Sequence, residues 1–519
     1  MPTLTIDGKT FEFEQGKSIL DVAHDNEMEI PHYCYHPSLS VVASCRICLA
    51  EVWAPNPRND NKLEPMPKLL PTCQTPAGDG QVVYTSSPKA TANQKAVMEM
   101  LLNHHPIDCP TCDQAGECDL QDYAYEYGRG VRRCDTEKIT QSKKDIGDNI
   151  MLYGDRCIMC TRCVRFADEI TGTSELFIDG RGAKECIDVF PGIGINNELS
   201  GNVIDICPVG ALLDKDFMFQ QRVWFLKSVP SIDPLTSSGD NIIIEHNNNQ
   251  VYRVKPRTNL DVNQYWITDE VRYGWKFVHS ESRVTELNDD AEMIASDILQ
   301  KAKNISLLVS PMLSCEDAWL LGTLVRGLDS NAIIGIGPVP IVGENKTFKS
   351  GFTMRSEKAP NARGVQRALG NSLDYDQWKQ QVVNADAVIV TGNYPEAWDT
   401  PEITKNQTLV LIDTLSNVLT ERADVFLPAA TWAEKAGTFE NYNNKLQLFE
   451  RAIHPIGGAQ AEGQIAMNLQ ALVDDMESTV FNPATVRRRM ADAGIAGMLE
   501  VELPKNTNRV DTDMPLSEV

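Results

Sequence analysis

Cysteines are concentrated in the N-terminal part of this chain. Thirteen of its 14 cysteines lie between Cys34 and Cys207, and only Cys315 follows them. Such clustering would indicate disulfides in a secreted protein, but the first residues, MPTLTIDGKTFEFEQGKS, show no export signal. Metal ligation is therefore the favoured interpretation. Thiolates bind zinc and iron, and iron–sulfur clusters would give the chain one-electron redox chemistry.

The first candidate ligand set has the spacing C-x10-C-x2-C-x24-C. Three cysteines in one loop with a distant fourth follow the logic of plant ferredoxins, although the first gap is longer here. Four cysteines also suit tetrahedral zinc, but zinc ribbons usually use two C-x2-C pairs and this set has one. A [2Fe–2S] cluster is the favoured interpretation for Cys34, Cys45, Cys48 and Cys73.

The second candidate set lies in the run HHPIDCPTCDQAGEC and has the spacing H-x3-C-x2-C-x5-C. Three cysteines at metal-ligand spacing directly downstream favour a ligand role for one of the two histidines. The spacing leaves His104 open as an alternative to His105, and it leaves zinc open beside iron. The set comprises His105, Cys109, Cys112 and Cys118.

The third candidate set contains the tight run C-x2-C-x2-C, and its distant fourth cysteine precedes Pro208. This is the bacterial ferredoxin signature, which predicts a [4Fe–4S] cluster. In two-cluster ferredoxins the cysteine before proline serves the other cluster. Because no second complete run exists here, Cys207 is assigned to the same cluster as Cys157, Cys160 and Cys163. The remaining Cys134, Cys186 and Cys315 are expected to be small buried hydrophobic residues.

The elements that carry the first set are predicted to be a small sheet with one helix. Strands are expected over 3–6, 11–13, 47–53 and 81–84, and a Ser18–Asp21 capping box begins a helix ending near Glu27. The segment 54–71 is rich in Pro, Asn and charge and is expected to be a surface loop. Helical spacing over 88–104 leads into the cysteine-dense region.

The C-terminal part has a different pattern. Asn-rich turn residues between 241–245 and 251–255 predict a hairpin. Strand-like runs at 305–309, 333–336, 387–390 and 409–412 then alternate with helices, one of them over 314–328. This alternation predicts a parallel α/β sheet.

Composition excludes several classes of function. The formal net charge of −24 argues against nucleic acid as a partner, because phosphate binding needs a basic surface. No apolar run approaches the roughly 20 residues of a membrane helix. No G-x-G-x-x-G or P-loop motif is present, so the chain shows no nucleotide site of its own.

The order of the three sets, with the motifs HHPIDCPTC, GECDLQDYAYEYG, DRCIMCTRCVRF and DICPVGAL, resembles the largest iron–sulfur subunit of NADH:quinone oxidoreductase, respiratory complex I. The stretch LPAATWAEKAGTFENYNNKLQ is similar to molybdopterin oxidoreductases. The resemblance maps the family's ligands onto the eleven cysteines above and onto His105 instead of His104. It implies one [2Fe–2S] cluster, two [4Fe–4S] clusters and no molybdopterin.

The resemblance implies an α+β [2Fe–2S] ferredoxin-like domain and a ferredoxin-type iron–sulfur region, followed by an α/β molybdopterin-oxidoreductase-like region. The expected divisions are 1–85 for the [2Fe–2S] domain, 86–150 for the His-ligated [4Fe–4S] domain, 151–220 for the ferredoxin-type [4Fe–4S] domain, 221–503 for the α/β region without its own cluster, and 504–519 for a polar tail.

One departure from the family pattern is informative. Molybdopterin-type enzymes and some bacterial members carry a further [4Fe–4S] motif, C-x2-C-x3-C-x27-C. The same spacing is present here without any thiolate, and hard oxygen ligands do not suit an iron–sulfur cluster. Unless the match in spacing is chance, this is a vacant cluster frame, formed by Asp233, Thr236, Asp240 and Thr268.

The implied function is electron relay within complex I. Electrons from NADH would enter at a flavin-bearing subunit and leave toward the quinone-reducing subunits of the peripheral arm, with proton translocation coupled in the whole complex. The chain would lack an NADH or quinone site and a membrane span, and would be held at the cytoplasmic face of the inner (plasma) membrane through the complex. The alternatives are a molybdenum formate dehydrogenase, an iron-only hydrogenase, and the diaphorase part of a soluble NAD-linked hydrogenase.

Overall fold

The computed structural model describes residues 1–135 and 137–501. The predicted tail at 504–519 lies outside the described residues. The chain divides into two compact units. The first comprises Met1–Phe225 with Phe348–Gly351, and the second comprises Leu226–Thr347 and the chain from Phe352 onward.

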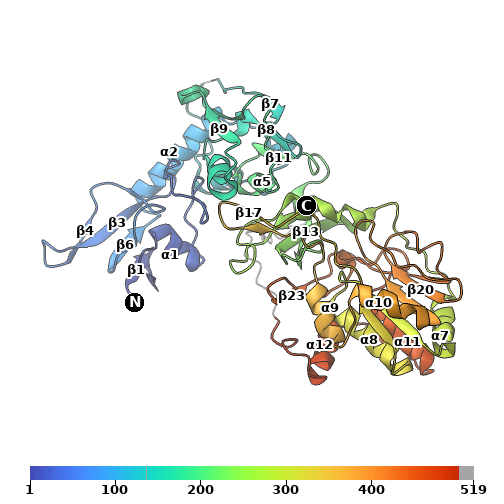
Figure 1. Cartoon of the computed structure of the whole chain (residues 1–519). Helices are drawn as coiled ribbons and strands as arrows, with labels where there is room; N and C mark the ends of the chain where they lie inside the picture. The colour runs from blue at the N-terminus through green and yellow to red at the C-terminus, as the bar shows by residue number, and fades with distance from the viewer. Residues whose placement is uncertain (136, 502–519) are drawn as a thin grey trace, which may run out of the picture. The chain divides into compact units, whose positions relative to one another are not determined.

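The first unit begins with a mixed sheet whose strands are ordered β2-β1-β6-β3-β4, with β5 paired to β3. Helix α1 begins as predicted, because the Ser18 hydroxyl accepts from the backbone of Asp21 and the Asp21 carboxylate accepts from the backbone of Ser18. Leu4, Ile19 and Val52 belong to one apolar core, and Figure 1 shows α1 beside the strands of this sheet. The elements are β1 (Thr3–Ile6), β2 (Lys9–Glu12), α1 (Ile19–Asp25), β3 (Leu49–Asn56), β4 (Lys62–Pro65), β5 (Leu70–Pro71) and β6 (Gln81–Tyr84).

The segment predicted as a surface loop is instead a β-hairpin. Strand β3 continues to Asn56 and pairs with β4 in antiparallel register. Asp60 and Asn61 adopt left-handed backbone conformations at the turn, which short polar side chains tolerate. The prediction was wrong because an exposed hairpin carries polar residues on both faces and so lacks the alternation expected of a half-buried strand.

The remainder of the first unit consists of short elements separated by cysteine-bearing loops. Helix α2 begins with Ser87 as its cap and Pro88 in its first turn. The elements are α2 (Pro88–His104), η1 (Cys109–Thr111), α3 (Asp119–Tyr127), β7 (Lys143–Asp145), β8 (Ile150–Tyr153), η2 (Gly154–Arg156), α4 (Arg162–Arg165), the π-helical η3 (Phe166–Thr171), β9 (Leu176–Asp179), η4 (Gly182–Lys184), β10 (Cys186–Val189), α5 (Asn202–Ile206), β11 (Leu212–Asp214) and η5 (Val223–Phe225).

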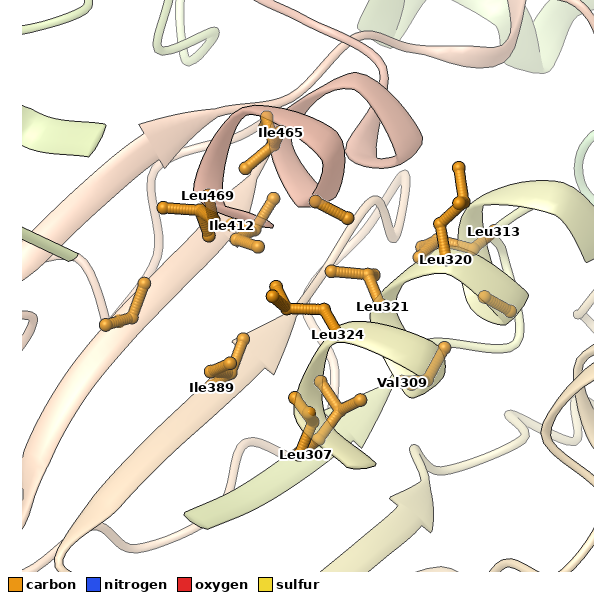
Figure 2. Packing of buried hydrophobic residues seen from close by; sticks show 14 of the residues in the cluster. Leu307, Val309, Leu313, Leu320, Leu321, Leu324, Ile389, Ile412, Ile465 and Leu469 are labelled. Atoms are coloured by element: carbon orange, nitrogen blue, oxygen red, sulfur yellow. The ribbon is translucent and has the colours of Figure 1, made fainter. Parts of the chain in front are cut away.

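The second unit contains the predicted parallel α/β sheet. Its strands are ordered β16-β15-β19-β20-β21, and every pairing is parallel. Alternate side chains serve opposite faces: Ala387 and Ile389 of β19 pack in one core, and Val388 and Val390 pack in the other. Figure 2 shows the first core, where leucines of α8 and α11 meet Ile389 and Ile412 of the sheet. Both faces are therefore buried, as parallel sheets require.

A three-stranded antiparallel sheet, β12-β13-β14, begins the second unit and contains the predicted hairpin. No helix in the described part of the chain combines the length and apolar character needed to cross a membrane. The elements of this unit are β12 (Lys227–Ile232), β13 (Asn241–Asn247), β14 (Gln250–Pro256), α6 (Asp269–Tyr273), η6 (Gly274–His279), α7 (Ala291–Lys301), β15 (Ile305–Val309), α8 (Cys315–Leu328), β16 (Ile333–Ile336), β17 (Lys346–Thr347), β18 (Thr353–Met354), α9 (Ala362–Leu369), α10 (Tyr375–Gln381), η7 (Val382–Asn384), β19 (Ala387–Thr391), β20 (Thr408–Asp413), β21 (Val425–Pro428), η8 (Trp432–Glu434), β22 (Gly437–Glu440), β23 (Leu446–Phe449), α11 (Glu462–Val473) and α12 (Pro483–Asp492).

Candidate iron–sulfur ligand sets

The first set forms two close pairs of thiols. The Sγ atoms of Cys34 and Cys45 are 3.5 Å apart, and those of Cys48 and Cys73 are 3.6 Å apart. The hydrogen bond between the thiols of Cys34 and Cys45 lowers the pKa of Cys34 to about 5, and the same bond and burial raise the pKa of Cys45. One thiolate in each pair is thus stabilised before any metal binds, which suits a site that collects four thiolate ligands.

The third set encloses a cavity. All four of its cysteines, with Leu152, Ile187 and Val209 among the apolar residues, line one small cavity of about 20 Å³. Burial raises the pKa of all four thiols, that of Cys207 to about 11. Four buried thiols thus converge on one apolar cavity, and their donor chemistry fits a bound cluster.

Backbone geometry makes the thiols of the third set converge. Met159 and Thr161, which lie between the cysteines of the tight run, both adopt left-handed conformations with φ of 52° and 61°. Each such conformation costs of order 1–3 kcal/mol in a non-glycine residue and persists only where the surrounding structure imposes it. Strain of this kind is typical of ligand-binding loops.

The second set is more open. His105 follows α2, the three cysteines follow in η1 and the loop before α3, and no hydrogen bond joins the ring to these thiols among the described residues. The Nδ1 atom of His105 is buried without a hydrogen-bond partner in the described structure. Burial lowers the pKa of His105 to about 4, so its imidazole is neutral near pH 7 and keeps a lone pair for a metal. His104 is exposed.

Three arginines that sequence reasoning did not single out hold these loops. Arg156 is buried and pairs with Asp108 at 2.6 Å, and it donates to the carbonyl of Gly210 at 3.3 Å. Arg222 donates to the carbonyls of Cys112 and Cys109 at 2.9 and 3.1 Å. Arg165 contacts the first and third sets. For Arg156 and Arg165 the available signal was the run DRCIMCTRCVRF, in which arginines stand close to cysteines, whereas Arg222 lies outside this run.

The three sets share one apolar cluster in the first unit. It contains Cys34 of the first set, Cys118 of the second and Cys160 of the third, and Tyr33 and Tyr123 pack among them. Residues more than 100 positions apart in the sequence are thereby brought into a single water-poor core, where three redox groups could lie near one another.

The prediction for the unassigned cysteines is confirmed in one case and wrong in two. Cys315 is fully buried in the core of the α/β sheet. Cys134 and Cys186 are only partly buried. The side chain of Cys186 lies within 4.8 Å of the carboxylates of Asp179 and Asp188 on the β9–β10 hairpin, where polar neighbours take the place of an apolar core.

The four positions of the predicted vacant frame are all buried within the second unit. Asp233 accepts hydrogen bonds from the backbone of Leu235 at 2.8 Å and from the Thr236 hydroxyl. Thr268 caps α6, its hydroxyl accepting from the backbone of Val271 at 3.3 Å. Oδ2 of Asp240, by contrast, is buried without a hydrogen-bond partner in the described structure. Oxygen donors with these local partners do not fit an iron–sulfur cluster.

Five protein-family models match consecutive parts of the chain. They are the 2Fe-2S iron-sulfur cluster binding domain over 1–88, the NADH-ubiquinone oxidoreductase-G iron-sulfur binding region over 94–133, the ferredoxin-like domain of NADH-quinone oxidoreductase subunit 3 over 147–213, the NDSU1/NuoG-like 4Fe-4S domain of NADH-ubiquinone oxidoreductase over 226–276, and molybdopterin oxidoreductase over 381–471.

Curated relatives give the same result. An NADH-quinone oxidoreductase subunit of Rickettsia felis is 35% identical over 344 residues, which cover 64% of this chain and 50% of that protein. The mitochondrial 78 kDa subunit of NADH-ubiquinone oxidoreductase of Candida albicans is 33% identical over 76% of this chain and 52% of its own length. The chain belongs to the family of the largest iron–sulfur subunits of NADH:quinone oxidoreductase.

This iron–sulfur subunit spans about half the length of the curated relatives it matches. A solved structure, that of an NAD⁺-reducing [NiFe]-hydrogenase in the H₂-reduced state, contains a chain 28% identical to this one; the match covers 43% of this chain and 91% of that chain, with a TM-score of 0.37. The fold class predicted for the subunit is confirmed: [2Fe–2S] and [4Fe–4S] binding domains precede a molybdopterin-oxidoreductase-like α/β region.

For the second set of the subunit we expect His105→Ala to disturb one [4Fe–4S] signal in low-temperature EPR and to leave the signals of the other two sets unchanged. Of the two histidines, His105 offers the buried nitrogen without a partner. His104→Ala, which changes an exposed ring, serves as the control and should leave all signals intact. The reverse pattern would assign the ligand to His104.

The vacant frame of the subunit should make stability depend on pH. Burial raises the pKa of Asp233 to about 7 and that of Asp240 well above its usual range; Glu270 acts in the same direction on Asp233, and Arg355 opposes the shift of Asp240. The folded state therefore binds more protons than the unfolded state between about pH 4 and 7, and the free energy of unfolding should fall as pH rises through that window.

We expect Asp240→Asn to flatten this dependence and to stabilise the second unit by about 1–2 kcal/mol at pH 8, because the charge whose burial is unfavourable is removed. Six of the eight tryptophans lie between residues 266 and 432, so tryptophan fluorescence during denaturant unfolding reports mainly on this unit. Equal destabilisation of the variant at pH 5 and pH 8 would contradict the assignment.

Proposed function

We propose that this chain relays single electrons within NADH:quinone oxidoreductase, from a flavin-bearing neighbour toward the quinone-reducing subunits. The observation that carries the proposal is the shared apolar cluster in which cysteines of all three sets meet. Bound iron–sulfur clusters would supply one-electron transfer, and the chain's own residues hold their ligands in a core with little water. Supporting this, the described residues include three ligand sets but no dinucleotide fingerprint.

We propose one [2Fe–2S] cluster on the first set and one [4Fe–4S] cluster on each of the other two. The paired thiols of the first set, the cavity lined by the third set and the unpartnered nitrogen of His105 support these assignments. A place for the third set between the others is supported by two contacts: Arg165 joins its loop to the first set, and Gly210, near Cys207, packs against the thiol of Cys112.

We further propose that the α/β region of the second unit binds no cluster and no molybdopterin, and serves as a scaffold and docking surface. Cys315, the one thiol in this region, is fully buried against Asn361 and belongs to the core. The frame offers only oxygen donors. Association with the membrane would then be peripheral, at the cytoplasmic face, through other subunits of the complex.

The proposal is tested by the partner dependence of NADH oxidation. The purified full chain should contain about ten irons with matching acid-labile sulfide. By itself it should not oxidise NADH with an artificial electron acceptor, whereas addition of the flavin-bearing subunit should allow NADH to reduce the clusters. Stoichiometric zinc with little iron, or NADH oxidation by the chain alone, would refute the relay function.

A further inference from the structure

We propose that Arg165 is a positioning residue that ties the ligand loop of the first set to that of the third and raises the reduction potentials of both clusters. The inference deepens the proposed function and rests on the assignment of these two sets as cluster ligands. It concerns a side chain that ligates nothing and acts through the backbone of two ligand residues.

The guanidinium of Arg165 contacts both ligand loops at once. Its Nη2 atom donates to the backbone carbonyl of Cys34, at 2.5 Å, and to that of Cys160, at 3.3 Å. Its Nη1 atom donates to the carbonyl of Ser40 at 2.5 Å, and its Nε atom donates to the Thr161 hydroxyl at 3.3 Å. Every nitrogen of the group is thus used, and one nitrogen joins ligand residues that are 126 positions apart in the sequence.

Glu169 completes the attachment from the next turn of the same helical segment. Its carboxylate accepts from the backbone of Ser40 at 2.8 Å and from the Ser40 hydroxyl at 2.5 Å. The carbonyl of Ser40 is held by Arg165 and its N–H by Glu169. The segment that carries Cys163 therefore binds the loop that carries Cys34 through hydrogen bonds. Side chains of α4 and η3 thereby fix the distance between the two sets.

The charge of Arg165 gives this contact an electrostatic consequence. A guanidinium stays protonated in proteins, and this one interacts with the thiols of both Cys34 and Cys160. A fixed positive charge and hydrogen bonds beside a cluster stabilise its reduced, more negative form. Arg162 also lies near Cys160, but it donates to the carbonyl of Ile206, beside Cys207, so this hydrogen bond stays within the third set.

The requirement for arginine follows from geometry. A planar fork with several N–H groups can reach four acceptors in two loops, whereas the ammonium of lysine is a single point charge. Arg165→Lys should consequently keep most of the electrostatic effect and lose part of the attachment. Arg165→Met loses both. Glu169→Gln weakens the attachment to Ser40 while leaving the positive charge in place, and so is the matched control.

The experiment is an EPR-monitored redox titration of the full chain within the complex, with iron and sulfide content measured on the same samples. We expect Arg165→Met to lower the midpoint potentials of the first-set and third-set clusters together. The expected shift is about tenfold in the one-electron reduction equilibrium, or 59 mV. The second-set potential should be unchanged. Arg165→Lys should lower both potentials much less than Arg165→Met does, and Glu169→Gln should lower neither potential.

The outcomes separate the two proposals. Absence of cluster signals from the unmodified chain would refute the proposed function. Normal signals with unchanged potentials in Arg165→Met, or equal lowering in Glu169→Gln, would overturn the role of Arg165 and leave the relay function standing. If Arg165→Met does not retain iron, Arg165→Lys is compared with Glu169→Gln instead. The role of Arg165 then requires that both potentials fall somewhat in the lysine variant and stay at or above those of the unmodified chain in the glutamine variant.

Discussion

Replacing Lys435 by methionine should destabilise the second unit by about 3–5 kcal/mol, the usual cost of removing one partner from a buried ion pair. Lys435 is 3% exposed; its Nζ atom lies 2.9 Å from a carboxylate oxygen of Asp317 and also contacts Glu462. Although burial favours the neutral amine, the two carboxylates raise the pKa of Lys435. The substitution would leave both carboxylates buried without their cation.

The carboxylates that pair with Lys435 come from two different helices of the second unit. Asp317 lies in the first turn of α8 and accepts from the backbone of Gly463 at 2.9 Å, and Glu462 begins α11 and accepts from the amide of Asn393. Loss of Lys435 should therefore loosen the packing of α8 against α11 that Figure 2 shows.

The measurement is denaturant unfolding followed by tryptophan fluorescence. Lys301→Met is the control, because Lys301 forms an exposed pair with Asp297 on α7, and such pairs contribute about 0–1 kcal/mol. If the two variants lose the same stability, the buried network contributes no more to the fold than an exposed ion pair.

Replacing Cys163 by alanine should remove the third-set cluster and reduce NADH:quinone electron transfer through the complex to background. Cys163 lies on α4, is 7% exposed and lines the cavity of the third set. Alanine fills the same place without a thiolate. Because the loops of the third set contact those of both other sets, the loss should interrupt the relay between them.

The signals of the first and second sets should persist in this variant, and iron should fall by about four atoms. Cys186→Ala is the matched control, since it removes a cysteine of the same unit that belongs to none of the sets; iron content and electron transfer should be unchanged. Full activity in Cys163→Ala would place the third set off the path of electrons.

Much of the fold could be predicted from local patterns. The capping box at Ser18 sets the start of α1, and largely apolar runs such as Ile305–Val309 mark strands buried on both faces. The hairpin formed by β3 and β4 was missed because its exposed strands lack apolar alternation. Strand β21 (Val425–Pro428) was missed as well; it is a four-residue edge strand whose identity depends on pairing with β20.

The sequence by itself determined the candidate ligand chemistry of this protein: close cysteine spacing such as C-x2-C is a local property, and it places neighbouring thiols within reach of one metal group. Only the tertiary structure decided how the three sets relate. The contacts of Arg165 with Cys34 and Ser40, and of Lys435 with Asp317 and Glu462, join segments far apart in the chain. Such contacts form because packing of the elements buries polar groups, and each buried polar group needs a hydrogen-bond or ion-pair partner. No local pattern of residues predicts which distant group that partner will be.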